Sequence, residues 1–458
     1  MSDTTRRTFT KTAVAATALS YSRILGANDR VRMGYIGLGN RGDQVHEGFL
    51  EHGDQQTVAI CDLKPEYLDL AAGKSRSTPR RYQDYRALLE DQNVDAVVIA
   101  TPDHWHALMF VDACHAGKDV YVEKPLSLTV AEGRRMVEVA RRYNRVMQVG
   151  SQQRSAPHFA KCAELVQSGY VGDVSTIDCW IVSNEAPAGF GPAPDGAPPE
   201  GLDWDLYLGP SPKVPYNRNR YIWNWRWWWD YAGGNMTDWG AHHIDSIHQI
   251  MNADAPVSVF AAGSRMLKDN RDAPDTFLAT IEYPKFSVRF VNSQVGYRMD
   301  RYAGTLIYGT KGTLFVDRKG YEVMPSRFSA IVRGDLDQVQ DMLASRRREV
   351  TGEPRPRGGG QPPKPYCDPL KVTGLSLDPE VQILHVENFL DCVKSRQRPV
   401  ADVEIGHRSI VPCHLANVSY RVGRKLRWDG LKEKVLGDAE ASTLLGKRYR
   451  APWSLPKV

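Results

Sequence analysis

The chain has 458 residues, 42% of them hydrophobic and 25% charged, which is enough for two globular domains with cores of their own. Residues 1–27 hold four basic residues and one acidic residue, so they supply +3 of the formal net charge of +5, and the nearly neutral remainder does not favour a nucleic-acid-binding surface. The seven cysteines are scattered, odd in number and without a C-x-x-C pair, which indicates neither a disulfide framework nor a zinc site.

The first 27 residues are predicted to be a twin-arginine export signal. The paired Arg6 and Arg7 precede a phenylalanine, a lysine and a weakly apolar run over 13–19, which is far shorter than the ~20 residues of a membrane span. The alternative is an ordinary basic amphipathic tail. A twin-arginine signal implies recognition by the twin-arginine translocase and a periplasmic protein without stable membrane insertion. This pathway carries proteins that are already folded.

A glycine-rich turn between two predicted strands is the strongest motif in the chain. A strand over 31–36 leads into Gly37-Leu38-Gly39-Asn40-Arg41-Gly42 and a helix, and a second strand over 57–61 ends on Asp62. In this G-x-G-x-x-G arrangement the glycines permit a sharp turn, a close approach of a pyrophosphate and close packing of the helix. The acidic side chain is placed to bind the adenosine ribose hydroxyls. It favours NAD over NADP, because a carboxylate repels the extra phosphate.

The alternation of strands and helices continues to about residue 150. Helices are predicted over 66–75, 84–91 and 129–143, and a further helix, capped by residues 101–106, is predicted to run to about residue 115. Strands are predicted over 94–100, 119–122 and 146–149. This order predicts an α/β Rossmann domain over 28–150, with a doubly wound parallel sheet. Ligands bind at the carboxyl ends of the strands in such sheets, and Thr101-Pro102 and Glu123-Lys124-Pro125 each follow a strand.

Residues 151–458 are predicted to form an α+β domain for substrate binding, catalysis and oligomerisation. Its open, mostly antiparallel sheet is expected from strands over 257–262, 276–283, 287–293, 305–308 and 313–316, and closing helices are expected over 379–394 and 404–425. Residues 326–375 break this pattern with a charged, helix-like piece over 335–348 and a segment rich in proline and glycine. We interpret them as an extended insertion and a candidate arm onto a neighbouring subunit.

These motifs together resemble the glucose-fructose oxidoreductase / inositol dehydrogenase / MocA (Gfo/Idh/MocA) family. The resemblance rests on the glycine turn, Asp62, Thr101-Pro102-x-x-x-His106, Glu123-Lys124-Pro125 and Asp238-x-x-x-His242, and it covers the chain from about residue 30 onward. It implies a homo-oligomer, either a dimer or a tetramer. It also implies that the cofactor contacts Gly37, Gly39, Asn40, Arg41, Gly42, Asp62, Thr101, Pro102, His106, Glu123 and Lys124.

The resemblance places the family's catalytic residues on Lys124, Asp238 and His242. A cation at a strand end can polarise a substrate oxygen. Asp238 and His242 are spaced i, i+4 and share one face of a helix, so the carboxylate is expected to orient the imidazole, which takes a hydroxyl proton as hydride departs. The alternatives are an exposed lysine and a purely structural helix pair.

A metal site is the other interpretation of the same region, which contains Asp238, His242, His243, Asp245 and His248. His243 and Asp245 are expected to point away from the face that carries the catalytic pair. Three ligands then do not converge, so no metal is predicted. His104 is expected at the surface or as a helix cap.

Six of the eleven tryptophans lie between Trp223 and Trp239. Aromatic faces stack on the apolar faces of sugar rings, so the cluster favours a carbohydrate substrate, while core packing or a subunit interface is the alternative. We assign Arg226, Trp229 and Trp239 to substrate binding, with the arginine placed to grip hydroxyls or a carboxylate.

The sequence thus predicts an exported, NAD-dependent oxidoreductase that transfers hydride to or from a ring carbon of a sugar, glycoside or cyclitol. Because an exported enzyme meets no cytoplasmic nucleotide pool, the cofactor is expected to be held tightly. A redox-neutral glycoside hydrolase or lyase that oxidises its sugar only transiently is the second hypothesis. A non-catalytic binding protein on the same fold is the third, and the intact set Lys124, Asp238 and His242 argues against it.

Overall fold

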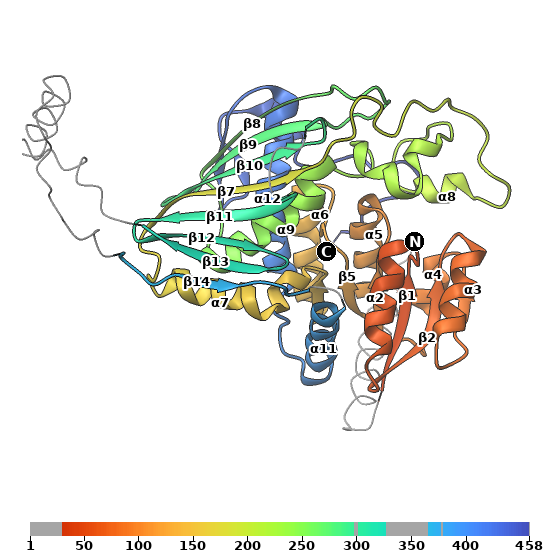
Figure 1. Cartoon of the computed structure of the whole chain (residues 1–458). Coiled ribbons are helices and arrows are strands. Elements are labelled where there is room, and N and C mark those ends of the chain that lie inside the picture. Colours follow the sequence, from red (N-terminus) through yellow and green to blue (C-terminus); the bar gives the residue numbers. More distant parts are fainter. Residues whose placement is uncertain (1–29, 297–300, 327–364, 377–378, 458) are drawn as a thin grey trace, which may run out of the picture.

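The computed structural model describes residues 30–296, 301–326, 365–376 and 379–457. The predicted export signal, the predicted helix over 335–348 and the proline-rich segment after it lie outside these residues. Two sheets form the frame of the molecule and lie side by side in Figure 1. No helix in the described part of the chain combines the length and the apolarity that crossing a membrane requires.

The first sheet confirms the predicted Rossmann domain. Its six strands are all parallel and have the order β3-β2-β1-β4-β5-β6. They are β1 (Val31–Ile36), β2 (Gln55–Cys61), β3 (Arg80–Tyr82), β4 (Ala96–Ile99), β5 (Asp119–Val122) and β6 (Met147–Val149). Every residue of β4 and β5 is buried, as expected for central parallel strands that are covered on both faces. The short edge strand β3 was not predicted.

Helices connect these strands and cover both faces of the sheet. They are α2 (Asn40–Leu50), α3 (Pro65–Lys74), α4 (Tyr85–Glu90), α5 (Asp103–His115) and α6 (Val130–Arg142). A late helix, α11 (Glu380–Ser395), packs against α2 and adds Val386, Phe389 and Leu390 to the apolar cluster on that side of the sheet. The first domain is therefore completed by a segment from the C-terminal part of the chain.

The second sheet is mostly antiparallel, as predicted. Its ten strands have the order β14-β13-β12-β11-β7-β10-β9-β8-β15-β16, and β7 and β10 form a parallel pair at its centre. They are β7 (Val174–Val182), β8 (Ser258–Ser264), β9 (Thr276–Glu282), β10 (Ser287–Ser293), β11 (Ala303–Gly309), β12 (Gly312–Asp317), β13 (Gly320–Pro325), β14 (Leu370–Val372), β15 (Leu426–Asp429) and β16 (Lys434–Val435). The sequence analysis predicted five of these strands and missed the central β7.

One end of the segment 326–375 differs from the predicted extended insertion. Residues Leu370–Val372 form β14, which pairs with β13 in the register Tyr321↔Val372. The alternation of this strand is too short, at three residues, to stand out from the surrounding sequence.

The remaining helices follow β6 in the chain. They are α7 (Pro157–Gln167), α8 (Trp204–Leu208), α9 (Gly234–Met251), α12 (Val403–Val422) and α13 (Ala439–Thr443), with 3-10 turns η1 (Gln152–Ser155), η2 (Arg218–Arg220) and η3 (Ile222–Trp227). The buried helix α12 packs against α9, against β8 of the second sheet and against α6 of the first domain. This packing places the N-terminal half of α9 opposite the carboxyl ends of β4 and β5.

Candidate active site

A cavity of about 580 Å³ lies between the carboxyl ends of the Rossmann strands and the start of α9. Most of the predicted site residues line it: Gly37, Gly39, Asn40, Arg41, Asp62, Thr101, Pro102, Glu123, Lys124, Arg226, Asp238, Trp239 and His242. The structure therefore brings the predicted nucleotide-binding and catalytic residues to one place. Gly42, His106 and Trp229 do not line this cavity.

The glycine turn has the conformation that its motif predicts. Gly37 has φ +85°, which side chains rarely adopt, and a Cβ on Gly42 would lie 2.0 Å from the carbonyl oxygen of Gly37. At Gly39 the nearest atom to such a Cβ is a carbon of Tyr67 at 3.7 Å, so the backbone is open toward the cavity. Helix α2 begins at the next residue and presents its N-terminus there.

Asp62 connects the glycine turn to the loop that follows β2. Its Oδ2 accepts a hydrogen bond from the backbone N–H of Leu38 at 2.7 Å, and its Oδ1 accepts one from Lys64 at 2.9 Å. Burial raises the pKa of this carboxyl, and the two N–H groups oppose that rise. The side chain lies where the ribose of a dinucleotide is expected, at the end of the second strand.

Glu123 ties the end of β5 to the glycine turn. Arg41 Nε donates to Glu123 Oε1 at 2.9 Å, and the backbone N–H of Lys124 donates to Oε2 at 3.1 Å. Gly150 leaves room for this carboxylate, since a Cβ there would lie 2.5 Å from Oε1. The predicted cofactor-binding role of Glu123 thus coexists with a structural one.

His106 holds two cavity-lining segments together from behind. Its Nδ1 lies 2.8 Å from the carbonyl oxygen of Pro125 and its Nε2 lies 2.9 Å from that of Thr101, and the ring is buried. His106 therefore lies behind the cavity wall, and its contact with the cofactor stays a prediction. His104 is also buried, with Nε2 3.1 Å from the carbonyl oxygen of Tyr207, so the expectation of a surface residue was wrong.

Lys124 and Asp238 form the central ion pair of the cavity. Lys124 Nζ lies 2.5 Å from Asp238 Oδ1, and Arg226 Nε lies 3.6 Å from the same oxygen. Burial raises the pKa of the Asp238 carboxyl, but the two cations outweigh burial and lower it to about 2. Asp238 is therefore a carboxylate at neutral pH.

His242 lies one turn further along α9 and lines the same cavity. Burial is the largest cause that holds the pKa of this imidazole well below 6.5, and the nearby cations Lys124 and Arg318 add to it. The sequence analysis expected Asp238 to orient His242. In the described structure the carboxylate pairs with Lys124 and Arg226 instead, because a buried cation competes for it more strongly than a neutral imidazole.

The other candidate metal ligands have partners elsewhere. His243 Nδ1 lies 3.0 Å from Thr305 Oγ1, Asp245 accepts from Arg154 Nε at 2.8 Å, and His248 Nε2 lies 2.7 Å from the hydroxyl of Tyr283. Across the described ranges, no group of three or more histidine, cysteine, aspartate or glutamate side chains is arranged to hold a metal ion.

The tryptophan cluster divides between the cavity and the core. Trp223, Trp225 and Trp239 line the cavity, and the Arg226 guanidinium carbon lies 4.9 Å and 4.5 Å from the ring centres of the first two. Trp227 and Trp228 are buried in a separate aromatic cluster.

The structure does not support the assignment of Trp229 to substrate binding, because this residue packs against Tyr420 and Arg421 outside the cavity. Adjacent residues of an irregular segment point in different directions, so a run of tryptophans cannot all face one ligand.

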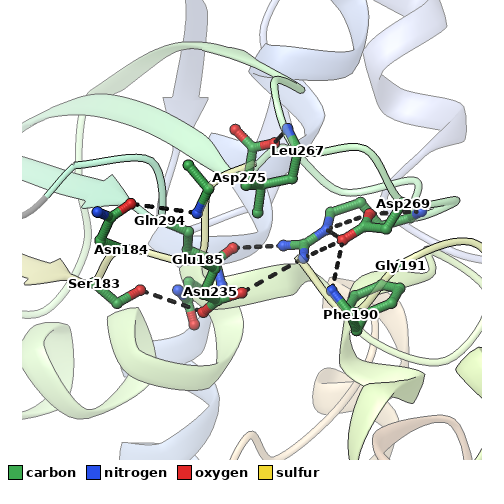
Figure 2. A network of polar contacts seen from close by, with 12 residues as sticks. Ser183, Asn184, Glu185, Phe190, Gly191, Asn235, Leu267, Asp269, Asp275 and Gln294 are labelled. Carbon is green, nitrogen blue, oxygen red and sulfur yellow. Dashed lines mark hydrogen bonds and ion pairs between the residues drawn. The ribbon is translucent and has the colours of Figure 1, made fainter. Parts of the chain in front are cut away.

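A polar network around Arg271 lies beside the buried Trp227 (Figure 2). The Arg271 guanidinium lies between the rings of Phe190 and Trp227, at 4.6 Å and 4.5 Å, and it donates to Asp269 and Gln294. In the first turn of α9, Asn235 Nδ2 donates to Asn292 Oδ1 at 2.6 Å, which ties the helix to β10. The start of α9, which carries Asp238, is thereby fixed to the second sheet.

Sequence analysis missed several residues that line the cavity: Lys64, Tyr67, Asp103, Gln152, Tyr221 and Arg318. Asp103 lies inside the recognised Thr101-Pro102-x-x-x-His106 motif, and this position was the signal that could have identified it. Arg318 comes from the turn between β12 and β13, where nothing local in the sequence points to a site.

The fold and this site define a two-domain protein with a Rossmann domain and a candidate nucleotide-binding cavity. The N-terminal domain of the Gfo/Idh/MocA family, described as an oxidoreductase family with an NAD-binding Rossmann fold, matches residues 31–151. Its C-terminal alpha/beta domain matches residues 191–317 and 371–455. The chain belongs to this family.

Curated relatives match over shorter stretches. A glycosyl hydrolase family 109 protein from Shewanella pealeana is 37% identical over 122 residues, which is 25% of this chain and 27% of the relative. The match thus spans about a quarter of that relative's length. Myo-inositol 2-dehydrogenase from Thermotoga maritima is 26% identical over 292 residues, covering 63% of this chain and 75% of the relative.

Solved structures share the fold over most of both chains. The WlbA dehydrogenase from Bordetella pertussis, in complex with NADH and UDP-GlcNAcA, has a TM-score of 0.61 at 19% identity and covers 88% of this chain and 99% of its own. Levoglucosan dehydrogenase in complex with NADH has a TM-score of 0.62 at 17% identity and covers 87% and 98%. At these identities the likeness shows a shared fold.

Proposed function

We propose that the protein is an NAD-dependent oxidoreductase that transfers hydride to or from a ring carbon of a sugar, glycoside or cyclitol. The observation that carries this proposal is that Lys124, Asp238 and His242 line the same cavity as the glycine turn and Asp62. A site that holds a dinucleotide at one end thus has an acid/base group and a cation at the other.

The residues fit a dinucleotide. The open backbone at Gly39 and the N-terminus of α2 can receive a pyrophosphate, and Asp62 can accept hydrogen bonds from the ribose hydroxyls. The same carboxylate favours NAD over NADP. The nicotinamide ring supplies the carbon that accepts or returns hydride.

The proton chemistry falls to the chain's own residues. His242 is neutral at physiological pH, because its pKa lies well below 6.5, and it can therefore take the proton of the reacting hydroxyl. Lys124 offers a positive charge to the same oxygen as negative charge develops on it. Asp238 holds Lys124 in place as its carboxylate partner. Arg226, fixed between two tryptophans, is placed to bind further hydroxyls.

Incubating the purified protein with a panel of sugars, glycosides and cyclitols tests this proposal. The absorbance of reduced nicotinamide should rise with at least one of them, and a ketone should appear at a ring carbon of the product. If every sugar-like compound leaves the nucleotide oxidised while an unrelated alcohol reduces it, the substrate class is wrong.

The second candidate is redox-neutral cleavage of a glycoside through transient oxidation. The relatives named glycosyl hydrolase family 109 favour it, although they match only about a quarter of this chain. Product analysis separates the two functions. Cleavage releases the free sugar and its leaving group with no net change in the nucleotide, whereas a dehydrogenase or transhydrogenase leaves an oxidised sugar.

Export and oligomerisation remain part of the proposal. The twin-arginine pattern at Arg6 and Arg7 supports transport of the folded protein, with its nucleotide held tightly, to the periplasm. Replacing both arginines with lysine keeps the charge but removes the paired guanidinium groups, so active protein should accumulate in the cytoplasm. Normal export of this variant would contradict the signal. Light scattering of the purified protein tests the expected dimer or tetramer.

A further inference from the structure

A second cavity, of about 320 Å³, lies directly behind one wall of the candidate active site. Its walls come from α9, β11, the turn between β12 and β13, and β14. The side chains of Trp239 and Arg318 line both cavities. The Arg318 guanidinium carbon lies 4.7 Å from the centre of the Trp239 ring, so this stacked pair lies where the two cavities adjoin.

Both carboxylates in the wall of this second cavity have cationic partners. Arg301 Nη1 lies 3.0 Å from Asp317 Oδ2, and Glu322 Oε2 lies 3.1 Å from Lys371 Nζ. The cations Arg318 and Lys319 also line the cavity, with the Arg318 guanidinium stacked on Trp239 and Lys319 exposed to solvent. Arginine and lysine N–H groups can donate hydrogen bonds to the hydroxyl oxygens of a ligand.

Hydroxyl, amide and aromatic groups make up much of the remaining wall: Gln153, Thr305, Thr373, Tyr302 and Tyr321. Tyr302 stands edge-on to Trp239 with ring centres 5.7 Å apart, and it is 46% exposed. Aromatic rings combined with hydrogen-bonding groups are suited to a polyhydroxylated ring, which has apolar faces and a polar edge.

We propose that the second cavity is a subsite for the second ring of a glycoside whose first ring reacts in the candidate active site. This inference rests on the proposed function and narrows its substrate class to disaccharides or larger glycosides. A cavity of this volume lies at the lower end of the roughly 300–1,000 Å³ typical of ligand sites, which suits one ring. Because Trp239 and Arg318 belong to both cavities, one extended substrate contacts the pair with both of its rings.

The proposal also gives β14 a role. Val372 and Thr373, at the end of this strand, line the far side of the cavity. Thr373 is exposed at the rim, so a larger side chain can fill the cavity there without disturbing the buried core. Thr280 is an exposed threonine on β9 of the same sheet that lines neither cavity, and it provides a matched control.

Calorimetric titration of the nucleotide-bound protein tests the subsite. The probes are glucose with maltose and cellobiose, and galactose with lactose. At least one disaccharide should bind about tenfold more tightly than its monosaccharide, or better. Thr373→Trp should abolish this difference while leaving monosaccharide affinity and nucleotide content unchanged, and Thr280→Trp should behave as the wild type.

The subsite is refuted if none of the disaccharides binds more tightly than its monosaccharide, or if Thr373→Trp keeps the full difference. If Thr373→Trp loses its nucleotide, Tyr302→Ala is tested instead. This variant must then bind disaccharides more weakly than the wild type while its monosaccharide affinity stays unchanged. Binding is measured here without turnover. Failure of the proposed oxidoreductase function, seen as an unchanged redox state of the nucleotide, is therefore distinguishable from failure of the subsite.

Discussion

Lys124 Nζ lies 2.5 Å from Asp238 Oδ1, and this contact joins the end of β5 in the first domain to α9 in the second. Lys124 also donates to the backbone carbonyl of Asp238 at 3.2 Å. The lysine is thus held at the position where both domains border the cavity. Its charge acts on the neighbouring His242, the proposed acid/base group, and lowers the pKa of that imidazole.

Replacing Lys124 with methionine should lower turnover by at least about a hundredfold, because the substrate oxygen loses its cationic partner. Bound nucleotide should be retained, since the glycine turn and Asp62 are unchanged. Steady-state kinetics and nucleotide content of the purified variant check both statements. Lys161→Met, at a partly exposed position on α7 outside the cavity, is the control and should keep normal turnover. Near-normal turnover of Lys124→Met would remove the lysine from the mechanism.

The pH dependence of turnover should show a base that stays neutral in mildly acidic solution. Burial and the charges of Lys124 and Arg318 keep the pKa of His242 well below 6.5, so the acid limb of the pH profile should lie below that value. Loss of a nearby cation raises the pKa of an imidazole. The residual activity of Lys124→Met should therefore show its acid limb at higher pH than the wild type, and an unshifted limb would contradict the assignment of His242.

The Asp238 carboxylate should stabilise the fold in a pH-dependent way. Its pKa is lowered from 3.8 to about 2, because the attraction of Lys124 and Arg226 outweighs the opposing effect of burial. A carboxyl whose pKa is depressed by folding stabilises the protein above its unfolded-state pKa, and this stabilisation is lost as pH falls through the folded-state value. The free energy of unfolding in urea should therefore change less between pH 5 and pH 2 for Asp238→Asn than for the wild type. The difference should be roughly the contribution of one carboxyl group. Parallel curves for the two proteins would show that the ion pair does not contribute.

Asp62 should set the choice of nucleotide. Asp62→Ala removes the acceptor for the ribose hydroxyls and also frees the N–H groups of Leu38 and Lys64, so NAD should bind about tenfold more weakly or worse. Asp62→Asn removes the charge but keeps an acceptor, so it should lose less affinity for NAD and should tolerate NADP better. Titration of nucleotide-free protein with both nucleotides measures the ratio of affinities. An unchanged ratio in both variants would refute the role of this carboxylate.

Local patterns were sufficient to predict the Rossmann half. The glycines at 37, 39 and 42 have backbone requirements that are recognisable in sequence, and β4 and β5 are apolar runs bounded by turns. The shorter β3 and β14 give no comparable signal, because three residues show no periodicity. Strand β7 begins with exposed residues and lies between two distant partners, so its central place in the sheet depends on tertiary pairing.

The candidate site was predictable as a set of residues and less so as a set of contacts. The i, i+4 spacing places Asp238 and His242 on one face of α9, but it does not reveal that Lys124 and Arg226 approach the carboxylate from other segments. The same limit explains why the sequence did not predict that Arg318 lines the cavity or that His106 contacts backbone carbonyls. The first reaches the cavity from a turn between strands, and the second uses both ring nitrogens on backbone carbonyls behind the cavity.

Identifying the nucleotide that the protein releases on denaturation, before and after incubation with the sugar panel, tests the proposed oxidoreductase function directly. The wild type and His242→Gln should both release NAD rather than NADP. An active sugar should convert the nucleotide to its reduced form in the wild type but at least about a hundredfold more slowly in His242→Gln. A protein that neither releases NAD nor binds it when NAD is added would contradict this function, as would equal reduction rates in the two proteins.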